Sequence, residues 1–295
     1  MRLYRCICSR AYARKLIEMK KFTLNLVVIL AVAALFFSCS GLSKVAKSGD
    51  PELIYSTAMK LYKAEKWSRA GDMFDACQGY YVGSEREDSI AFFSARSKFK
   101  ERDYHEASLG FDEFRRKFGR SLFIEDAEGM YALCEYYMAP EPSRDQTLTA
   151  KAIVSLTNFI ERYPESERIP AFREIIEELT GRMHEKNFLN AYSYFKTEKY
   201  KSAVVAFKNA LKTYDETPYR EKIMYYIVVS NYRLAHNSVA EKQADRYLSM
   251  LDSYYSFIEE FPESKSSKEL SRYFKEAKDF IDKNKQSEQS QSLEK

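Results

Sequence analysis

Hydrophobic and polar positions recur in three segments that align without gaps: KAEKWSRAGDMF from Lys63, KERDYHEASLGF from Lys100 and KTEKYKSAVVAF from Lys196. Each segment has an aromatic residue four positions after its lysine, an alanine three positions later and a phenylalanine four positions after that. The residues are Trp67, Ala70 and Phe74, then Tyr104, Ala107 and Phe111, then Tyr200, Ala203 and Phe207. Spacings of three and four place residues on one helical face. The pattern predicts a helix beginning near each aromatic residue.

A second helix is predicted upstream of each segment. There an aromatic residue is followed three positions later by alanine, as in Tyr55 with Ala58, Phe92 with Ala95, and Phe188 with Ala191. Alanines at these positions let two helices approach closely, because a bulky side chain would hold the backbones apart. A helix pair of this kind is the pattern of a tetratricopeptide repeat, a unit of about 34 residues that stacks with its neighbours.

Two nearly identical octapeptides, FIERYPES from Phe159 and FIEEFPES from Phe257, indicate where second helices end. Proline cannot continue a helix, and it restricts the residue before it. Tyr163 and Phe261, each followed by proline, are therefore the predicted ends of two helices.

Five helix pairs account for most of the chain. The aromatic and small positions of the third and fifth pairs are Tyr131 with Cys134, and Ile227 with Ser230. Around Ile169 to Thr197 we expect either one long first helix or an extra helix, and a final helix from Ser266 to Asp282 would cap the array. The predicted fold is all-α, a right-handed superhelix of about five tetratricopeptide (helix-turn-helix) repeats.

The first 40 residues read as a processing segment. A basic start at Lys20 and Lys21 precedes the apolar run Leu26 to Phe37, which is too short to span a bilayer. Ser38 and Cys39 follow and resemble a bacterial lipobox, in which the cysteine thiol is lipidated. We expect Met19 to be the true start; an ordinary membrane anchor or cleaved secretory signal is the alternative.

The expected organisation has four parts. Residues 1–38 are an extension and signal peptide that is removed, 39–49 a lipidated tether, 50–282 the repeat solenoid, and 283–295 a disordered tail.

Charge and composition narrow the function. The leader holds seven of the 47 Lys and Arg and one of the 43 Asp and Glu, so residues 39–295 keep 40 basic and 42 acidic residues, a formal net charge of −2. This nearly neutral balance does not indicate a nucleic-acid-binding surface, which would need clustered Lys and Arg. With 9 Gly and 7 Pro against 23 Tyr and 20 Phe, long helices packed through aromatic side chains are favoured over turn-rich sheets.

No catalytic or metal-binding chemistry stands out. His105, His184 and His236 occur singly in polar contexts, without a second ligand at metal spacing or a nucleophile motif nearby. Cys77 and Cys134 fall at small positions of the helical pattern, where buried thiols are expected rather than a disulfide. We therefore expect no enzyme activity, no cofactor and no metal.

The lipid site followed by five repeats, with FxxxYP-type repeat ends and a KxxxY turn, resembles the BamD family of lipoproteins over residues 39 to about 282. That family belongs to the machinery that assembles β-barrel proteins in the outer membrane. The resemblance implies a scaffold at the periplasmic side of the outer membrane. It also implies partnership with the barrel-forming BamA subunit and a role in receiving unfolded outer-membrane proteins.

A groove lined by first helices is the predicted binding surface for a client peptide that ends in an aromatic residue and a free carboxylate. Its predicted residues are Tyr55, Met59, Tyr62, Phe92, Arg96, Phe99, Lys100, Tyr131 and Met138. Rings would stack on the client, and the two cations would pair with its carboxylate. The competing interpretation is that Tyr55, Phe92 and Tyr131 are core residues.

Two other functions share the repeat pattern. One is a different periplasmic adaptor lipoprotein, for instance one that organises peptidoglycan or an export apparatus. The other is a glycan-binding surface lipoprotein, which should carry exposed aromatics in long loops. The one sizeable insertion, MAPEPSRDQT from Met138, has no aromatic residue, so glycan binding is disfavoured.

Overall fold

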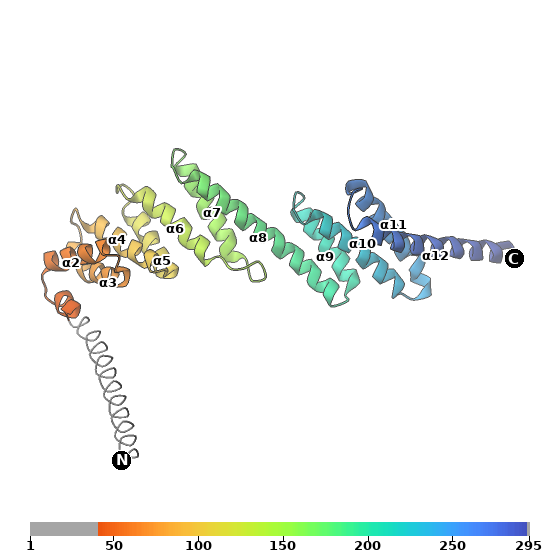
Figure 1. The fold of residues 1–295 in the computed structure, drawn as a ribbon, viewed down its shortest axis with the longest axis horizontal. Coiled ribbons are helices and arrows are strands. Elements are labelled where there is room, and N and C mark those ends of the chain that lie inside the picture. Colours follow the sequence, from red (N-terminus) through yellow and green to blue (C-terminus); the bar gives the residue numbers. More distant parts are fainter. Residues whose placement is uncertain (1–40, 294–295) are drawn as a thin grey trace, which may run out of the picture. The chain divides into compact units, whose positions relative to one another are not determined.

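A computed structural model describes the backbone of residues 41–293 and the side chains of residues 41–286, and all regular structure in this range is helical. The predicted signal peptide and Cys39 lie outside the described residues. The helices follow one another as antiparallel pairs (Figure 1). They divide into two compact units, with the boundary between Tyr131 and Ala132.

The first unit holds two complete helix pairs and the start of a third. Residues 41–46 form a short helix. The elements that follow are α2 (Pro51–Lys63), α3 (Trp67–Gln78), the 3₁₀ turn η1 (Gly79–Tyr81), α4 (Glu87–Lys100), α5 (Tyr104–Lys117) and the beginning of α6 (Ile124–Met138).

The second unit begins within α6 and completes the repeat array. Its elements are α7 (Thr147–Arg162), α8 (Ile169–Lys196), α9 (Tyr200–Thr213), α10 (Arg220–His236), α11 (Ala240–Glu260) and α12 (Ser267–Leu293). Residues 41–293 therefore contain five helix pairs and a terminal helix, as the sequence predicted. The region for which the sequence allowed either one long helix or an extra helix is a single 28-residue helix, α8.

The turn inside a pair has the same geometry in the first, second and fourth repeats. Its second residue has a left-handed backbone, with φ of 57° at Glu65, 69° at Arg102 and 58° at Glu198. The last two residues before the second helix close this turn by donating their backbone N–H groups to carbonyls three and five residues earlier. This is the Schellman ending of a helix, which usually has glycine at the left-handed position. The lysine of each aligned segment is thus the last residue of a first helix.

The small and aromatic positions of the repeat pattern form the helix contacts. Ala70, Ala107 and Ala203 are fully buried, and so are the phenylalanines four residues after them. In the second repeat the two helices approach closely at Gly110, because a Cβ built there would lie 2.9 Å from the Cβ of Ala95.

The octapeptides mark loops between pairs. The backbone N–H of Tyr163 donates to the carbonyl of Phe159 at 2.9 Å, and that of Phe261 to Phe257 at 2.8 Å, so both helices end where the sequence predicted. Three residues after each aromatic cap, a serine donates its N–H back to the carbonyl of the cap.

The same loop recurs without proline. Phe118 ends α5, Ser121 donates its N–H to the carbonyl of Phe118 at 2.9 Å, and the Ser121 hydroxyl accepts the N–H of Phe123 at 3.2 Å. Gly119 occupies the proline position there. The recurring elements are therefore an aromatic cap and a hydroxyl residue three positions later, and proline is an optional addition.

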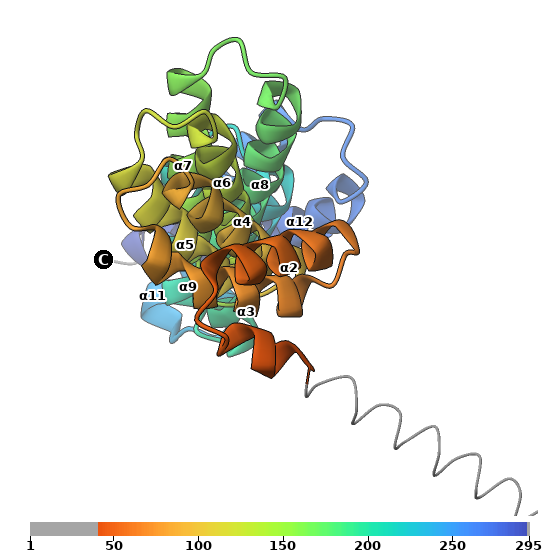
Figure 2. The ribbon, with the colours of Figure 1, turned by 90° about the vertical axis from the view of Figure 1, so that its left-hand side faces the viewer.

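Both ends of the described chain differ from the expected boundaries. Residues 41–46 lie within the expected tether, yet they are helical and pack Leu42, Val45 and Ala46 against the core of the first repeat. Figures 1 and 2 place this short helix beside α2 and α3. At the other end, α12 continues to Leu293, where we expected a disordered tail from residue 283. Residues 283–293 contain no Gly or Pro, and extending an existing helix needs no new nucleation.

In the second unit, the insertion that follows α6 is fastened to the middle of α8. The Arg182 guanidinium donates to the carbonyl of Ala139 at 3.1 Å, and the Lys186 ammonium donates to the carbonyl of Ser143 at 2.9 Å. Two cations of one helix thereby hold a loop that has no regular structure of its own.

Candidate functional site

Arg96 lies on α4, the first helix of the second repeat. Acidic residues open this helix and Lys98 and Lys100 close it, an arrangement that suits the helix dipole. The Arg96 side chain is half-buried, with its guanidinium carbon 5.8 Å from the centre of the Phe92 ring. Its Nε atom is buried, and it has no hydrogen-bond partner among the described residues.

Tyr62 on α2 is a neighbour of this guanidinium. Burial raises the pKa of the Tyr62 hydroxyl, and the positive charge of Arg96 acts in the opposite direction. The Tyr62 ring also makes edge contacts with Trp67 at 5.1 Å and Phe93 at 5.0 Å between ring centres. A cation and a phenol therefore come together where the first two repeats meet.

Lys100, the last residue of α4, adds a second cation. It is exposed, and its ammonium nitrogen lies 6.0 Å from the centre of the Trp67 ring. Within the described part of the chain, neither Arg96 nor Lys100 makes an ion pair, whereas neighbouring Lys98 pairs with Asp75 at 3.1 Å. Two positive charges thus remain available to an anion.

Comparison of equivalent positions in the repeats distinguishes residues that the repeat fold requires from residues that it does not require. Tyr62, Phe99 and Phe195 occupy one position, and each ring makes a T-shaped contact with the first residue of the following helix, at 5.1, 5.5 and 5.8 Å between ring centres. Tyr62 and Phe99 therefore serve the turn. Lys100 also recurs, as Lys63 and Lys196.

Arg96 is different. Its equivalents are Met59 in the first repeat and Tyr192 in the fourth, so the repeat itself does not call for a cation at this position. Of the predicted groove residues of the first unit, Arg96 is the one whose chemistry is not explained by packing of the helix pair.

Two predicted groove residues belong to the core instead. Phe92 is 1% exposed and stacks on Phe123 with 4.7 Å between ring centres. Tyr131 is 8% exposed, and the Arg115 guanidinium lies 4.3 Å above its ring. The aromatic position of the first helix faces the neighbouring helices, so neither ring is available for stacking on a client.

The other predicted groove residues, Tyr55, Met59 and Met138, are neither fully buried nor fully exposed. Tyr55 and Met59 are half-buried and pack against the first-repeat core, and Tyr55 also lies under the Arg86 guanidinium at 5.2 Å. Met138 ends α6 in the second unit and is half-buried. Trp67 is a site residue that the sequence analysis missed, because the repeat pattern indicated it only as the start of a helix. Its position directly after the turn that follows Tyr62 could have indicated that its ring lies beside Tyr62.

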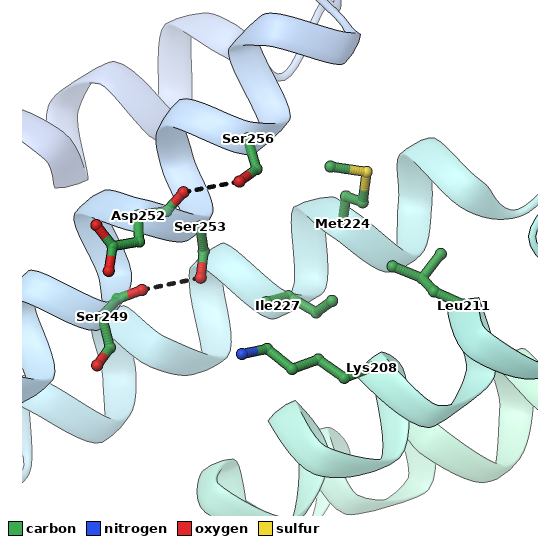
Figure 3. Close-up of a pocket in the computed structure, with 8 residues that line it drawn as sticks. All are labelled: Lys208, Leu211, Met224, Ile227, Ser249, Asp252, Ser253 and Ser256. Atoms are coloured by element: carbon green, nitrogen blue, oxygen red, sulfur yellow. Dashed lines mark hydrogen bonds between the residues drawn. The ribbon is translucent and has the colours of Figure 1, made fainter.

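A separate cavity of about 310 Å³ lies in the second unit (Figure 3). Leu211, Met224 and Ile227 give it an apolar side. The other lining residues are Lys208, Ser249, Asp252, Ser253 and Ser256. All three serine hydroxyls donate to carbonyls of their own helix, so none is free to act as a donor. The cavity can accept an apolar side chain and offers no nucleophile paired with a base.

The cysteines and one of the histidines considered in the sequence analysis lie in packed surroundings that indicate a structural role. Cys77 and Cys134 are free and buried, and burial raises the pKa of these thiols to about 11 and about 12. The expected buried thiols are thus confirmed. His184 packs on Tyr214 with 4.6 Å between ring centres. Among the side chains of residues 41–286, no three metal-ligating groups converge.

Membrane-spanning character is also absent from this part of the chain: none of its helices combines the length and apolar character needed to cross a bilayer.

The repeated helix pairs define a tetratricopeptide-repeat protein of the all-α class. Residues 47–248 match the profile of the YfiO family, described as outer membrane lipoprotein, and the chain belongs to this family. It is 22% identical over 220 residues to the outer membrane protein assembly factor BamD of Caulobacter vibrioides, covering 73% of this chain and 72% of that protein. It is 23% identical over 155 residues to BamD of Helicobacter pylori, covering 52% and 70%.

Solved structures similar to the chain include two tetratricopeptide-repeat proteins. One is a thermophilic protein of Thermus thermophilus, at 14% identity and a TM-score of 0.32, and the other is the TPR2AB domain of yeast Sti1, at 12% identity and a TM-score of 0.38. Each match covers 77% of this chain and 98% of the other.

Proposed function

We propose that this chain is a non-enzymatic scaffold of the machinery that folds and inserts β-barrel proteins into the outer membrane. Membership of a family of outer membrane lipoproteins supports this, as do two relatives named outer membrane protein assembly factors. The scaffold is anchored through lipidated Cys39 and faces the periplasm. Its partners are a BamA-like barrel subunit and unfolded outer-membrane proteins.

Client recognition is assigned to the face of the first unit that carries Arg96 and Lys100. The observation that carries this assignment is a pair of cations one helical turn apart, the half-buried Arg96 and the exposed Lys100, neither of which forms an ion pair with a described residue. A carboxylate at the end of a client chain would accept hydrogen bonds from the accessible nitrogens of these two cations. Charge-assisted hydrogen bonds of this kind contribute about 1.5–3 kcal/mol each.

In this proposal the aromatic rings near these cations pack within the protein and do not stack on the client. Tyr62 lies near Arg96 and Trp67 lies near Lys100, so each cation has an aromatic ring as a neighbour. Specificity for a terminal carboxylate then comes from charge and hydrogen bonding.

Affinity purification of the tagged protein from outer membranes tests the function. We expect a barrel-forming BamA-like subunit to co-purify. A variant with a surface charge reversed elsewhere, Lys201→Glu on the exposed side of α9, is the control and should recover the same subunit. Recovery of peptidoglycan-associated or export proteins without a barrel subunit would contradict the proposal and favour a different periplasmic adaptor.

A further inference from the structure

The short helix of residues 41–46 couples the proposed lipid site to the first repeat. Leu42, Val45 and Ala46 pack against the same core as Ile54 and Ala58 of α2. Cys39 lies three residues before Leu42, a stretch that spans at most about 11 Å when fully extended. A lipid on Cys39 would therefore hold the first repeat close to the bilayer surface.

The surface of the first repeat suits that position. Residues 41–70 contain six Lys or Arg and three Asp or Glu, although residues 39–295 as a whole have a formal net charge of −2. One of the three acids, Glu52, is already paired with Arg86 at 2.6 Å. Residues 41–70 thus carry a formal net charge of +3 directly after the proposed anchor.

Several residues of α2, the helix that follows the short helix, are exposed. Leu53, Ser56 and Lys60 have the spacing i, i+3 and i+7, so they lie on one helical face, and that face is directed away from Ile54 and Ala58. Leu53 is 44% exposed, so this face presents one apolar side chain to solvent. Lys44 and Lys47 are exposed as well, and like Lys60 they form no ion pair with a described residue.

We propose that Lys44, Lys47 and Lys60, with Leu53, form a surface that docks on anionic lipid headgroups. The inference rests on the proposed anchoring through Cys39. Lysines with long apolar stems hold headgroup phosphates while an exposed leucine enters the interface, the combination by which peripheral segments bind anionic membranes. Docking fixes the orientation of the first repeat at the membrane, rather than leaving the solenoid to swing on a loose tether.

Fluorescence quenching in lipid vesicles tests the docking. The lipidated full-length mature protein carries a bimane at Ser56→Cys or, as the control position, at exposed Ser202→Cys on α9. Cys77 and Cys134 are buried, so labelling is restricted to the introduced thiol. Vesicles contain a headgroup nitroxide quencher and either phosphatidylglycerol with phosphatidylcholine, or phosphatidylcholine alone.

In phosphatidylglycerol vesicles we expect quenching at position 56 to exceed that at 202 several-fold. The difference should disappear in about 1 M salt, because the Debye length falls to about 3 Å there. It should also disappear in Lys44→Glu/Lys47→Glu/Lys60→Glu. The matched control Lys268→Glu/Lys275→Glu/Lys278→Glu reverses three exposed charges on α12. It should retain the difference in quenching between positions 56 and 202.

Equal quenching at both positions, or a difference unaffected by charge reversal and by salt, would overturn the docking surface. Flotation of the protein with vesicles reports the anchor separately. Failure to float would refute anchoring through Cys39, whereas flotation with equal quenching would refute docking alone.

Discussion

Gly110 of α5 and Ala95 of α4 form a close helix contact in the second repeat, with room for no side chain at position 110. A Cβ there would lie 2.9 Å from the Cβ of Ala95 and 3.5 Å from its Cα. Because Ala95 is a buried residue on a packed helix, it cannot move aside as the end of a flexible side chain could.

Gly110→Val should therefore lower the free energy of unfolding by about 1–3 kcal/mol through overpacking. Urea unfolding followed by circular dichroism measures this. Gly181→Ala in α8 is the matched control, since no described neighbour lies within 4 Å of a Cβ placed at that position. It should gain up to about 1 kcal/mol from helix propensity. Equal stability of Gly110→Val and parent would contradict the close approach.

Arg102→Gly should stabilise the protein by about 0.5–1 kcal/mol, because Arg102 holds a φ of 69° that costs an L-residue energy and glycine little. Thermal unfolding should show a higher midpoint. The adjacent residue Glu101 has φ −76°, so Glu101→Gly should instead lower the midpoint. If both changes destabilise equally, the left-handed turn is not strained.

Glu87 links the stability of the first unit to pH. Its carboxylate accepts a hydrogen bond from Lys117 at 2.5 Å and one from the N–H of Gly83 at 2.8 Å, and these interactions hold its pKa below the ordinary glutamate value. A depressed folded-state pKa contributes stability above the unfolded-state pKa, and that contribution is lost as pH falls through the folded-state value.

Glu87→Gln should consequently be less stable than the parent at neutral pH, and the difference should shrink progressively in acid. Chemical unfolding at a series of pH values gives the difference directly. A gap that stays constant with pH would show that the ionised form of Glu87 is not the stabilising species.

Cys39→Ser should abolish lipidation, because the thiol is the nucleophile that accepts the lipid and a serine hydroxyl is a poor substitute. Metabolic labelling with a fatty-acid analogue should vanish in this variant and persist in Ser40→Ala. Labelling that survives Cys39→Ser would remove the lipid site from position 39.

The helix pairs were predictable because their signal is local and repeated. Ala107 and Phe111 occupy the same places as Ala203 and Phe207, and the helix contacts require these sizes at these spacings. The caps at Tyr163 and Phe261 were predictable for a similar reason, since proline has a direct steric effect. The end of α12 was not, because polar composition alone does not show whether a packed helix continues.

The candidate site was only partly predictable. A spacing of three and four places Phe92 and Arg96 on neighbouring parts of α4, but it cannot tell which side chain faces the core. Phe92 is in the core, while the Arg96 guanidinium lacks a described hydrogen-bond partner at Nε. That distinction depends on contacts between helices that are distant in sequence, such as the stacking of Phe92 on Phe123.

The central claim is that Arg96 and Lys100 bind the terminal carboxylate of a client. Calorimetric titration of the purified protein with a peptide ending in phenylalanine and a free carboxylate tests it most directly. We expect Arg96→Glu/Lys100→Glu to weaken binding by roughly 10-fold or more, as the loss of a charge-assisted hydrogen bond implies. Lys201→Glu/Lys212→Glu on α9 should bind like the parent, and amidation of the peptide terminus should weaken binding to the parent alone. Equal affinity of the folded double variant and the parent for the free-acid peptide would contradict the claim.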